Sequence, residues 1–396
     1  MLSFRVVAED GAARRGVLTT DHGELETPGF FGVATQAALK GLDPEAARRA
    51  GVGALIANAY HLHLQPGGEA VARAGGLHRY MGWEGVLATD SGGFQVFSLQ
   101  HGHVADEIKG RRRLPALAED EGSPVPAVKV DEDGAEFRSY LDGSRQRFTP
   151  ESSMALQRDL GADLLMCLDE CTPFHVPAEY TRAATERNLR WARRCWEEFE
   201  RLGMGGRQSL YGINHGGVYP ALRQLSARTI GDLPFAGMAI GDCLGQTKAD
   251  WYRVVELVVP LLPEERPRHL LGVGEPDDLV EGALRGVDSF DCAMPTRIAR
   301  HGNAHHLGLP RFRLDLGDSV RAREDGPIEE GCDCHTCARY GRAYLHHLFK
   351  AHEMLAVSLT AEHNLRFTAR LLERVRGAIS AGRLAELRRE VLSTAG

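Results

Sequence analysis

The feature that most constrains the fold is a regular alternation of short apolar, β-rich runs with amphipathic helical patterns. Such an alternation is typical of a parallel sheet whose strands are joined by crossover helices. Eight runs in roughly 300 residues match a (β/α)8 (TIM) barrel, which usually takes about 250 residues plus insertions. A doubly wound open sheet is the competing fold, but no Gly-x-Gly-x-x-Gly pattern follows the first run. The expected strands are 27–35, 52–60, 85–90, 162–170, 208–215, 235–242, 268–275 and 288–296; the expected helices are 43–51, 67–76, 151–161, 179–202, 219–230, 248–262 and 276–287.

Polar residues stand at the ends of nearly all the expected strands. Active sites of such barrels lie at the carboxyl ends of the strands. One or two of these residues are explained as caps of the helices that follow, because Asp, Ser and Asn favour N-cap positions. Seven on one rim are better explained as a polar pocket, formed by Asn58, Asp90, Asp169 with Glu170, Asn214 with His215, Asp242, Gly274 with Glu275, and Asp291 with Arg297.

The stretch ATDSGGFQVFSLQ, residues 88–100, places Asp90 directly after an apolar approach. Burying an unpaired carboxylate there costs several kcal/mol. A turn explains the pattern without any function, since Asp and Ser favour turn starts and paired glycines supply positive φ. The stretch alone favours the turn, and only the rest of the chain can change that reading.

Composition sets broad limits. The chain has 396 residues, 43% hydrophobic and 26% charged, as in an ordinary globular protein. No apolar run approaches the ~18 residues of a membrane span, and the N-terminus lacks a signal-peptide core, so we expect a cytoplasmic protein without membrane contact. A net charge of -7 argues against sequence-independent coating of nucleic acid but leaves room for local basic patches.

A cysteine cluster, GCDCHTC at residues 331–337, contains Cys332, Cys334 and Cys337. Three thiols at this spacing in a reducing compartment indicate zinc ligands, with redox pairing as the alternative. Three cysteines and one histidine leave no open coordination position, so the metal is expected to be structural. Spacing does not choose the fourth ligand among His335, His346, His347, His352 and His363.

Several motifs together resemble the bacterial tRNA-guanine transglycosylases, a queuine tRNA-ribosyltransferase family. The resemblance runs from about residue 4 to the end and rests on TDSGGFQVFSL, YLDGS with TPE, DECTP, LGVGEPDD, FDCAMPTR, CDCHTC, RAYLHHL and EHN. It implies a (β/α)8 barrel with an inserted C-terminal zinc-binding subdomain. The implied division is a barrel at 1–310 with a longer loop at about 101–128, a zinc subdomain at 311–363, and C-terminal helices at 364–396 that pack back on the barrel.

The resemblance also implies an activity: exchange of guanine at the tRNA wobble position for a 7-deazaguanine such as preQ1, in queuosine biosynthesis. The implied partners are tRNAs with a GUN anticodon, those for Asp, Asn, His and Tyr, and a second copy of the chain in a homodimer. By resemblance, Asp90 is the general acid/base and Asp291 the nucleophile, while Cys332, Cys334, Cys337 and His363 bind one structural zinc ion. The implied base-binding residues are Ser91, Gly92, Gly93, Phe94, Asp169, His215 and Asp242; the implied RNA-binding residues are Gly272, Val273, Gly274, Glu275, Pro276, Asp277, Asp278, Thr296, Arg297, Ile298, Ala299 and Arg300.

The chemistry explains the residue types. Replacing a base on a ribose passes through an oxocarbenium-like state, as in glycoside cleavage. One carboxylate attacks C1′ and holds the ribose while the base departs, and a second group handles the proton. Glycines beside Asp90 would let a flat purine lie close to the backbone. Asp169 is suited to a bidentate pair of hydrogen bonds with the N1/N2 edge of guanine.

Two recognition positions depart from the family pattern. GINHGG places His215 where the family usually has a glutamine, and GDCLGQ places Asp242 where it has a glycine, without the usual glutamate. These changes affect recognition of the incoming base and spare both catalytic aspartates, so queuine, preQ0 or another 7-substituted deazaguanine stays open beside preQ1. Asp242 is a candidate partner for a cationic aminomethyl group.

The basic run KGRRR lies in the long segment 101–128, which is either a solvated surface loop or an extra phosphate contact. Two other functions remain as alternatives. A non-catalytic RNA-binding partner subunit would be expected to lose one or both of Asp90 and Asp291. A hydrolase of free nucleosides would leave the zinc cluster and the TRIAR segment, residues 296–300, without a purpose.

Overall fold

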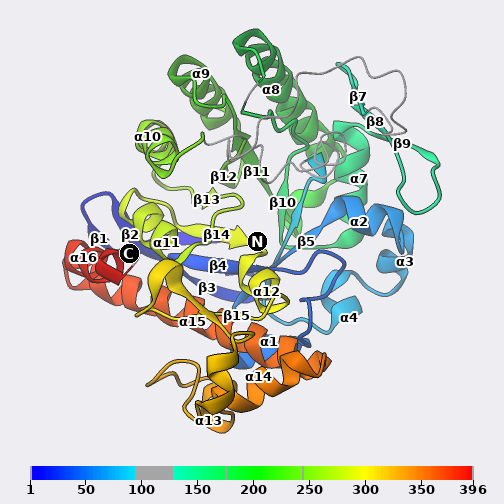
Figure 1. Cartoon of the computed structure of the whole chain (residues 1–396). Coiled ribbons are helices and arrows are strands. Elements are labelled where there is room, and N and C mark those ends of the chain that lie inside the picture. The colour runs from blue at the N-terminus through cyan, green and yellow to red at the C-terminus, as the bar shows by residue number, and fades with distance from the viewer. Residues whose placement is uncertain (1, 94–127, 175, 243–244, 395–396) are drawn as a thin grey trace.

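The predicted barrel is confirmed. The computed structural model describes residues 2–93, 128–174, 176–242 and 245–394. Eight parallel strands close in the order β4-β5-β6-β10-β11-β12-β13-β14 (Figure 1). All eight fall inside the expected runs: β4 Gly29–Val33, β5 Ala54–Asn58, β6 Val86–Asp90, β10 Leu164–Met166, β11 Ser209–Asn214, β12 Gly237–Ile240, β13 Arg268–Leu270 and β14 Ser289–Cys292.

The strands are nearly continuous apolar runs because both of their faces are buried. Residues of β5, β10, β11, β12 and β13 are buried throughout. Most polar side chains therefore stand where the strands stop, at the carboxyl ends, although β13 itself begins with the buried Arg268 and His269. This arrangement brings the predicted polar rim to one end of the barrel.

The helices form a ring outside the strands (Figure 1). Local chemistry fixes several of their starts: Thr149 and Thr247 form capping boxes, and Asp43 caps a helix that begins with Pro44. The seven expected helices are present, and short helices at 59–64 and 77–81 accompany them. Their bounds are α1 Pro44–Arg49, α2 Ala59–Leu64, α3 Gly68–Arg73, α4 Leu77–Met81, α7 Pro150–Leu160, α8 Ala178–Arg201, α9 Pro220–Gly231, α10 Lys248–Val258, α11 Pro276–Leu284 and α12 Met294–Ala299, with 3-10 turns η1 Met204–Gly206 and η2 Val259–Leu261.

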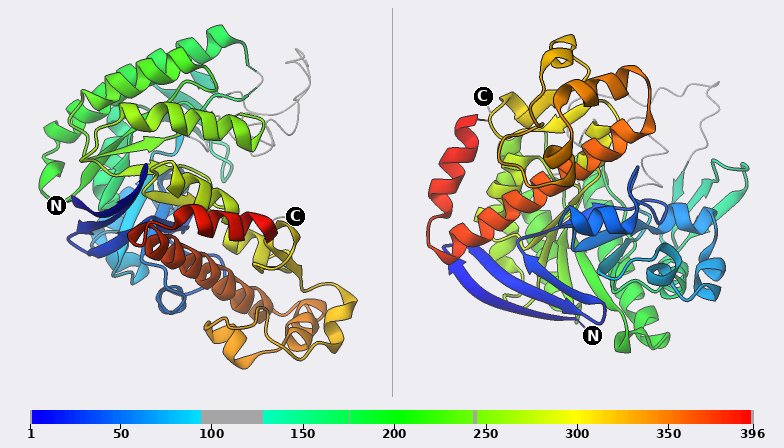
Figure 2. Two further views of the ribbon diagram at one scale, coloured as in Figure 1. Left: turned by 90° about the vertical axis from the view of Figure 1, so that its left-hand side faces the viewer. Right: turned by 90° about the horizontal axis from the view of Figure 1, so that it is seen from below.

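Three small antiparallel sheets lie outside the barrel and were not expected from the sequence. The N-terminal sheet has the order β1-β2-β3, and its third strand packs against β6. Its blue strands lie together along one side of the molecule in Figure 2. The strands of the three sheets are β1 Ser3–Asp10, β2 Ala13–Thr20 and β3 Gly23–Thr27; β7 Lys129–Val130, β8 Ala135–Arg138 and β9 Arg145–Phe148; β15 Asn303–His305 and β16 Arg313–Asp315.

The C-terminal part protrudes from the barrel and has a small core of its own (Figure 2). The chain after β15 contains, besides β16, the elements η3 Pro310–Phe312, η4 Ser319–Arg323, α13 His335–Arg339, α14 Arg342–Lys350, α15 Met354–Ser380 and α16 Leu384–Thr394, of which α16 lies against α11 of the barrel. Helix α15 contacts α13 and α14 and also β1, β2 and β4, so one continuous helix joins this part to the barrel. The predicted limit at residue 363 falls inside α15, and the three-part division stays a prediction.

Within the described ranges, every helix is too short or too polar to span a lipid bilayer. Most of segment 101–128 and residue Phe94 lie outside the described residues, so the predictions made for them stay untested.

Candidate active site

The first carboxylate of the rim, Asp90, ends strand β6 and is held in one position. Strand register places it opposite Asn58, the last residue of β5. Its Oδ1 accepts hydrogen bonds from the amides of Ala59, at 3.0 Å, and Gly92, at 3.1 Å. The Asn58 side-chain amide donates to Oδ2, while its own oxygen caps α2. The turn chemistry and the polar site therefore coexist at Asp90.

Burial sets the proton affinity of Asp90. Burial is the largest of the causes that raise the pKa of the carboxyl to about 7; the nearby charges of Asp291 and Asp169 contribute to the rise, and the hydrogen bonds from Ala59 and Gly92 oppose it. Near neutral pH both protonation states are populated. A group in this condition is suited to both donating and accepting a proton, as general acid/base catalysis requires.

The second carboxylate, Asp291, lies on β14 and is bound differently. Its Oδ1 accepts from His269 Nε2 and from the amide of Gly272, each at 3.1 Å. No described residue donates a hydrogen bond to Oδ2. The side chain as a whole is 14% exposed, so the carboxylate is not sealed inside the barrel. One oriented oxygen and one free oxygen suit a nucleophile.

A third carboxylate, Asp169, lies beside the first two and forms a buried polar cluster with Ser91 and His215. Ser91 donates to Asp169 Oδ1 at 2.8 Å. His215 Nε2 lies 3.5 Å from Asp169 Oδ2, and neither ring nitrogen of this buried histidine has a hydrogen-bond partner among the described residues. Burial raises the pKa of Asp169, although His215 and Ser91 oppose it. Buried polar atoms without partners are costly, so they mark a place where a ligand supplies the missing bonds.

Two glycines after Asp90 are required by the packing of the protein itself. A Cβ on Gly93 would lie 2.1 Å from the backbone oxygen of Asp169, and Gly92 has φ +84°. Only glycine fits these two positions comfortably. The close approach therefore brings Asp90, Ser91 and Asp169 together before any substrate binds.

Asp242 ties three loops of the rim together. The backbone of Asp242 has a positive φ of 70°. Its carboxylate accepts four hydrogen bonds: from the Thr172 amide at 2.7 Å, from the Thr172 hydroxyl at 2.8 Å, and from the amides of Gly216 and Gly217 at 3.1 and 2.7 Å. Burial raises its pKa, but His215, Arg223 and Thr172 outweigh burial and hold the pKa below its ordinary value. Both oxygens of Asp242 are therefore already engaged by donors of the protein.

The two predicted RNA-binding segments are placed near Asp291 with different exposure. Gly272 is exposed and Gly274 is buried, in the loop between β13 and α11. The carboxylates that follow are used internally: Glu275 pairs with Arg313, and Asp277 and Asp278 pair with Lys248. In the second segment Thr296 and Ala299 are buried, whereas Arg297 and Arg300 on and after α12 are exposed.

A separate cluster brings together the four predicted metal ligands. The Nδ1 atom of His363 lies 3.6 Å from the sulfurs of Cys332 and Cys334 and 3.3 Å from that of Cys337. A tetrahedral zinc site gives sulfur-to-nitrogen separations of about 3.5 Å, from bond lengths near 2.3 and 2.0 Å. His363 Nε2 lies 2.8 Å from the carbonyl oxygen of His305, which orients the ring. These four residues could hold a metal ion.

A second group with metal-ligand chemistry, His22, His78 and Asp163, lies at the start of β10. The imidazoles stack with centroids 3.6 Å apart, and His22 Nδ1 lies 2.6 Å from Asp163 Oδ1. The other oxygen of Asp163 accepts from the amide of Leu87. The imidazole nitrogens of His22 and His78 thus face the Asp163 carboxylate. The two rings are stacked face to face, so their nitrogen lone pairs do not converge on one metal ion. We assign the group to joining the β2–β3 turn to the barrel.

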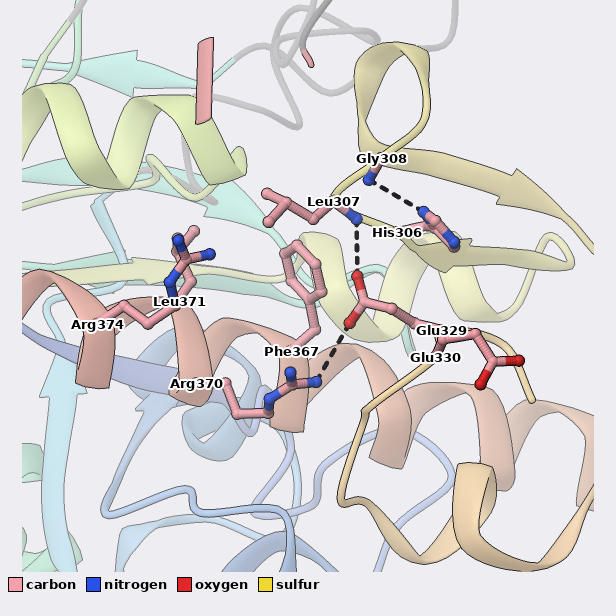
Figure 3. A pocket seen from close by; sticks show the side chains of 9 residues that line it. All are labelled: His306, Leu307, Gly308, Glu329, Glu330, Phe367, Arg370, Leu371 and Arg374. Atoms are coloured by element: carbon pink, nitrogen blue, oxygen red, sulfur yellow. Dashed lines mark hydrogen bonds and ion pairs between the residues drawn. The ribbon is translucent and has the colours of Figure 1, made fainter. Parts of the chain in front are cut away.

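The pocket drawn in Figure 3 lies away from the rim, between α15 and the loop after β15. Its volume is about 360 Å³. Glu329 accepts from the Leu307 amide and pairs with Arg370, while Arg374 pairs with Glu390. Two glutamates, Glu329 and Glu330, and two arginines, Arg370 and Arg374, line the pocket, so its lining has no excess of either charge and we assign it no role.

His269 was not predicted from the sequence. It lies in the short buried strand β13, of sequence RHL, and belongs to no motif, so the only signal in the sequence is a histidine at the start of the run RHLLGVGE. His269 contacts Asp291 directly, but the motif FDCAMPTR predicted only Asp291.

Known proteins are similar to this chain over nearly its whole length. The family model described as Queuine tRNA-ribosyltransferase matches residues 9–396. A queuine tRNA-ribosyltransferase of Roseiflexus sp. (strain RS-1) is 46% identical over 402 residues, covering 99% of each chain. One of Pelotomaculum thermopropionicum is 46% identical over 99% of this chain and 98% of its own. One of Thermoanaerobacter pseudethanolicus is 41% identical over 100% of this chain and 98% of its own.

Proposed function

The chain belongs to the queuine tRNA-ribosyltransferase family and is a tRNA-guanine transglycosylase of queuosine biosynthesis, and from this premise we propose its substrates and its catalytic residues. It exchanges guanine at the wobble position of GUN-anticodon tRNAs, those for Asp, Asn, His and Tyr, for a 7-deazaguanine. The exchange is a double displacement through a covalent enzyme–RNA intermediate. The incoming base is preQ1, with queuine and preQ0 as the alternatives.

The observation that carries the mechanism is the contrast between Asp90 and Asp291. Burial raises the pKa of Asp90 to about 7, while Asp291 has one oxygen oriented by two donors and one oxygen without a described donor. Retaining glycoside chemistry needs these two roles: a nucleophile and an acid/base that changes protonation during the cycle. We assign the nucleophile to Asp291 and the acid/base to Asp90.

The exchange takes place in two displacements at C1′ of the ribose. A carboxylate oxygen of Asp291 bonds to C1′ while the C1′–N9 bond breaks, and the bonding pair leaves with guanine, which takes a proton from Asp90. The incoming base gives its N9 proton to Asp90 and bonds to C1′, releasing Asp291. The phosphodiester chain is untouched throughout, and both carboxyl groups return to their starting state.

We propose that Asp169, Ser91 and His215 bind the base, with Gly92, Gly93 and Phe94 as further base-binding residues. Asp169 accepts hydrogen bonds from N1–H and the N2 amino group of the base. The unpartnered nitrogens of His215 are suited to the O6 edge, where the family usually has a glutamine. Ser91 holds Asp169 in position through its hydroxyl.

The occupied state of Asp242 changes what the sequence suggested for the 7-substituent. A carboxylate that already accepts four hydrogen bonds is a poor partner for a cationic aminomethyl group. Asp242 therefore acts on the base through the shape of the three loops that it ties together. This arrangement supports keeping queuine and preQ0 as alternatives to preQ1.

The remaining assignments concern partners and metal. Cys332, Cys334, Cys337 and His363 hold one structural zinc ion. The exposed Arg297 and Arg300 bind tRNA phosphates, and the loop at Gly272–Asp278 lies along the RNA. The enzyme acts as a homodimer in the cytoplasm, where its tRNA substrates are found.

The test is base exchange with radiolabelled guanine and a tRNA carrying a GUN anticodon, with the same tRNA changed at the wobble guanine as the control. We expect label to enter only the GUN tRNA. Release of free guanine without incorporation would indicate hydrolysis instead. Competition by preQ1, preQ0 and queuine in the same assay ranks the incoming bases.

A further inference from the structure

A chain of hydrogen bonds lies directly behind Asp291. The ring of His269 bridges two residues of the neighbouring strand β14: Nδ1 lies 2.9 Å from Ser289 Oγ, and Nε2 lies 3.1 Å from Asp291 Oδ1. The amide of Gly272 donates to the same Oδ1 at 3.1 Å. Together these groups engage one oxygen of Asp291 from two directions.

Strand register produces this arrangement. His269 and Ser289 are direct partners in the β13–β14 ladder, and Asp291 lies two residues beyond Ser289 on the same face. The imidazole is 2% exposed and meets the Phe31 ring edge-on, with centroids 5.3 Å apart. Its position is therefore fixed by the barrel and not by a mobile loop.

The partners also fix which nitrogen carries a proton. An ionised carboxylate only accepts, so Nε2 must carry the hydrogen that faces Asp291. The Ser289 hydroxyl can donate to Nδ1 or accept from it, so this bond holds the ring with either placement of the Nδ1 proton. This assignment leaves Asp291 Oδ1 with two donors and Oδ2 with none among the described residues.

We propose that His269 is the positioning residue of the nucleophile: with the Gly272 amide it holds Oδ1 of Asp291, so that Oδ2 is the oxygen that attacks C1′. Oδ1 then becomes the carbonyl oxygen of the glycosyl ester, and its two donors stabilise the carboxylate again when the ester is displaced. The inference rests on the proposed function, in which Asp291 forms the covalent bond.

The experiment measures single-turnover formation of the denaturation-resistant enzyme–RNA adduct and, separately, the dissociation constant for tRNA. His269→Ala is expected to slow adduct formation by about 10²-fold, the loss that follows a misplacement of about 1 Å in a reacting group. Binding of tRNA should stay within about twofold, because the ring is buried behind Asp291. His269→Gln, whose side-chain amide can donate near the Nε2 position, should recover most of the rate.

Ser289→Ala is the milder second variant, which keeps the imidazole and removes only the partner of Nδ1. It should slow adduct formation less than His269→Ala does, and it keeps the test available if the alanine variant fails to fold. His346→Ala is the matched control, because His346 is also buried and bonds the Leu316 carbonyl in the C-terminal part. The control should form adduct at the wild-type rate.

Adduct formation at the wild-type rate in folded His269→Ala would overturn the proposal, as would equal slowing in His269→Ala and His269→Gln with tRNA binding lost in both. Failure of the proposed function looks different. In that case the wild type forms no adduct, or Asp291→Asn still forms it.

Discussion

The rim of the barrel and the cysteine cluster are both groups of polar side chains in a protein interior, but they differ in how completely the protein satisfies them. In the cluster, three sulfurs lie around one nitrogen of His363, whose other nitrogen faces a backbone carbonyl. On the rim, both ring nitrogens of His215 lack hydrogen-bond partners in the described structure.

The difference separates a structural role from a binding role. A complete ligand set leaves no open position, so an ion there stabilises the fold and takes no part in the reaction. Incomplete hydrogen bonding is destabilising, and it is retained where a substrate supplies the missing partners. Asp90 has donors on both of its oxygens, but burial raises its pKa to about 7, and a proton affinity shifted this far is typical of a functional site.

The largest expected effect concerns the complete cluster. Because metal-binding energy is folding energy in such sites, on the order of 10 kcal/mol, Cys334→Ser should lose the zinc and unfold the C-terminal part. Metal content by atomic spectroscopy and thermal unfolding check this, with His352→Ala as a control outside the cluster. One zinc per chain in His363→Ala would show that another histidine is the ligand.

The next expected effect is that of Asp90→Asn, which should lower the activity but raise the stability relative to wild type as the pH increases. Asp90→Asn should lower base exchange by about 10²- to 10⁴-fold, the usual contribution of a general acid/base. The raised pKa means that the folded protein holds the proton more tightly than the unfolded chain. The stabilisation from this proton is complete below about pH 4 and is lost as the pH rises through about 7.

Asp90→Asn should therefore gain in melting temperature relative to wild type as the pH is raised from 5 to 8. The exposed Asp232→Asn serves as the control and should show no such trend. A gain of Asp90→Asn that shrinks with rising pH would contradict the assigned pKa direction.

A smaller effect is expected in the base pocket. His215→Gln and Asp242→Gly should change the ratios of kcat/KM among guanine, preQ0, preQ1 and queuine, by about 10- to 100-fold at most, because specificity is a ratio of these constants. His215 would act by direct contact with the base. Asp242 would act through the loops that it holds, so its variant should also lower the melting temperature. Unchanged ratios in both variants would place neither residue in the pocket.

The sequence predicted the barrel well because buried parallel strands are apolar runs with strong local signals. The antiparallel sheet β1–β3 gave a weaker signal: the residues of β1 alternate between exposed and half-buried, and the apolar run in its sequence SFRVVAED is only three residues long, VVA. Such a strand forms only if it pairs in the right register with another segment of the chain. The pattern of a single segment does not show that pairing.

The site was predictable where a motif names a residue and unpredictable where only geometry does. Asp90, Asp169 and Asp291 were selected by motifs, and the structure gathers them at one rim. The bonds from His269 to Asp291 and from Asp242 to Gly216 and Gly217 cross between strand ends. They depend on how neighbouring strands are aligned, which no local pattern shows.

The most direct test of the central claim is to identify the residue that carries the RNA. Enzyme and GUN tRNA are mixed without an incoming base, denatured, digested with nuclease and protease, and analysed by mass spectrometry. The account predicts a ribosyl ester on the peptide that contains Asp291, with no adduct in Asp291→Asn. An ester on another residue, or exchange that continues at the wild-type rate in Asp291→Asn, would contradict it.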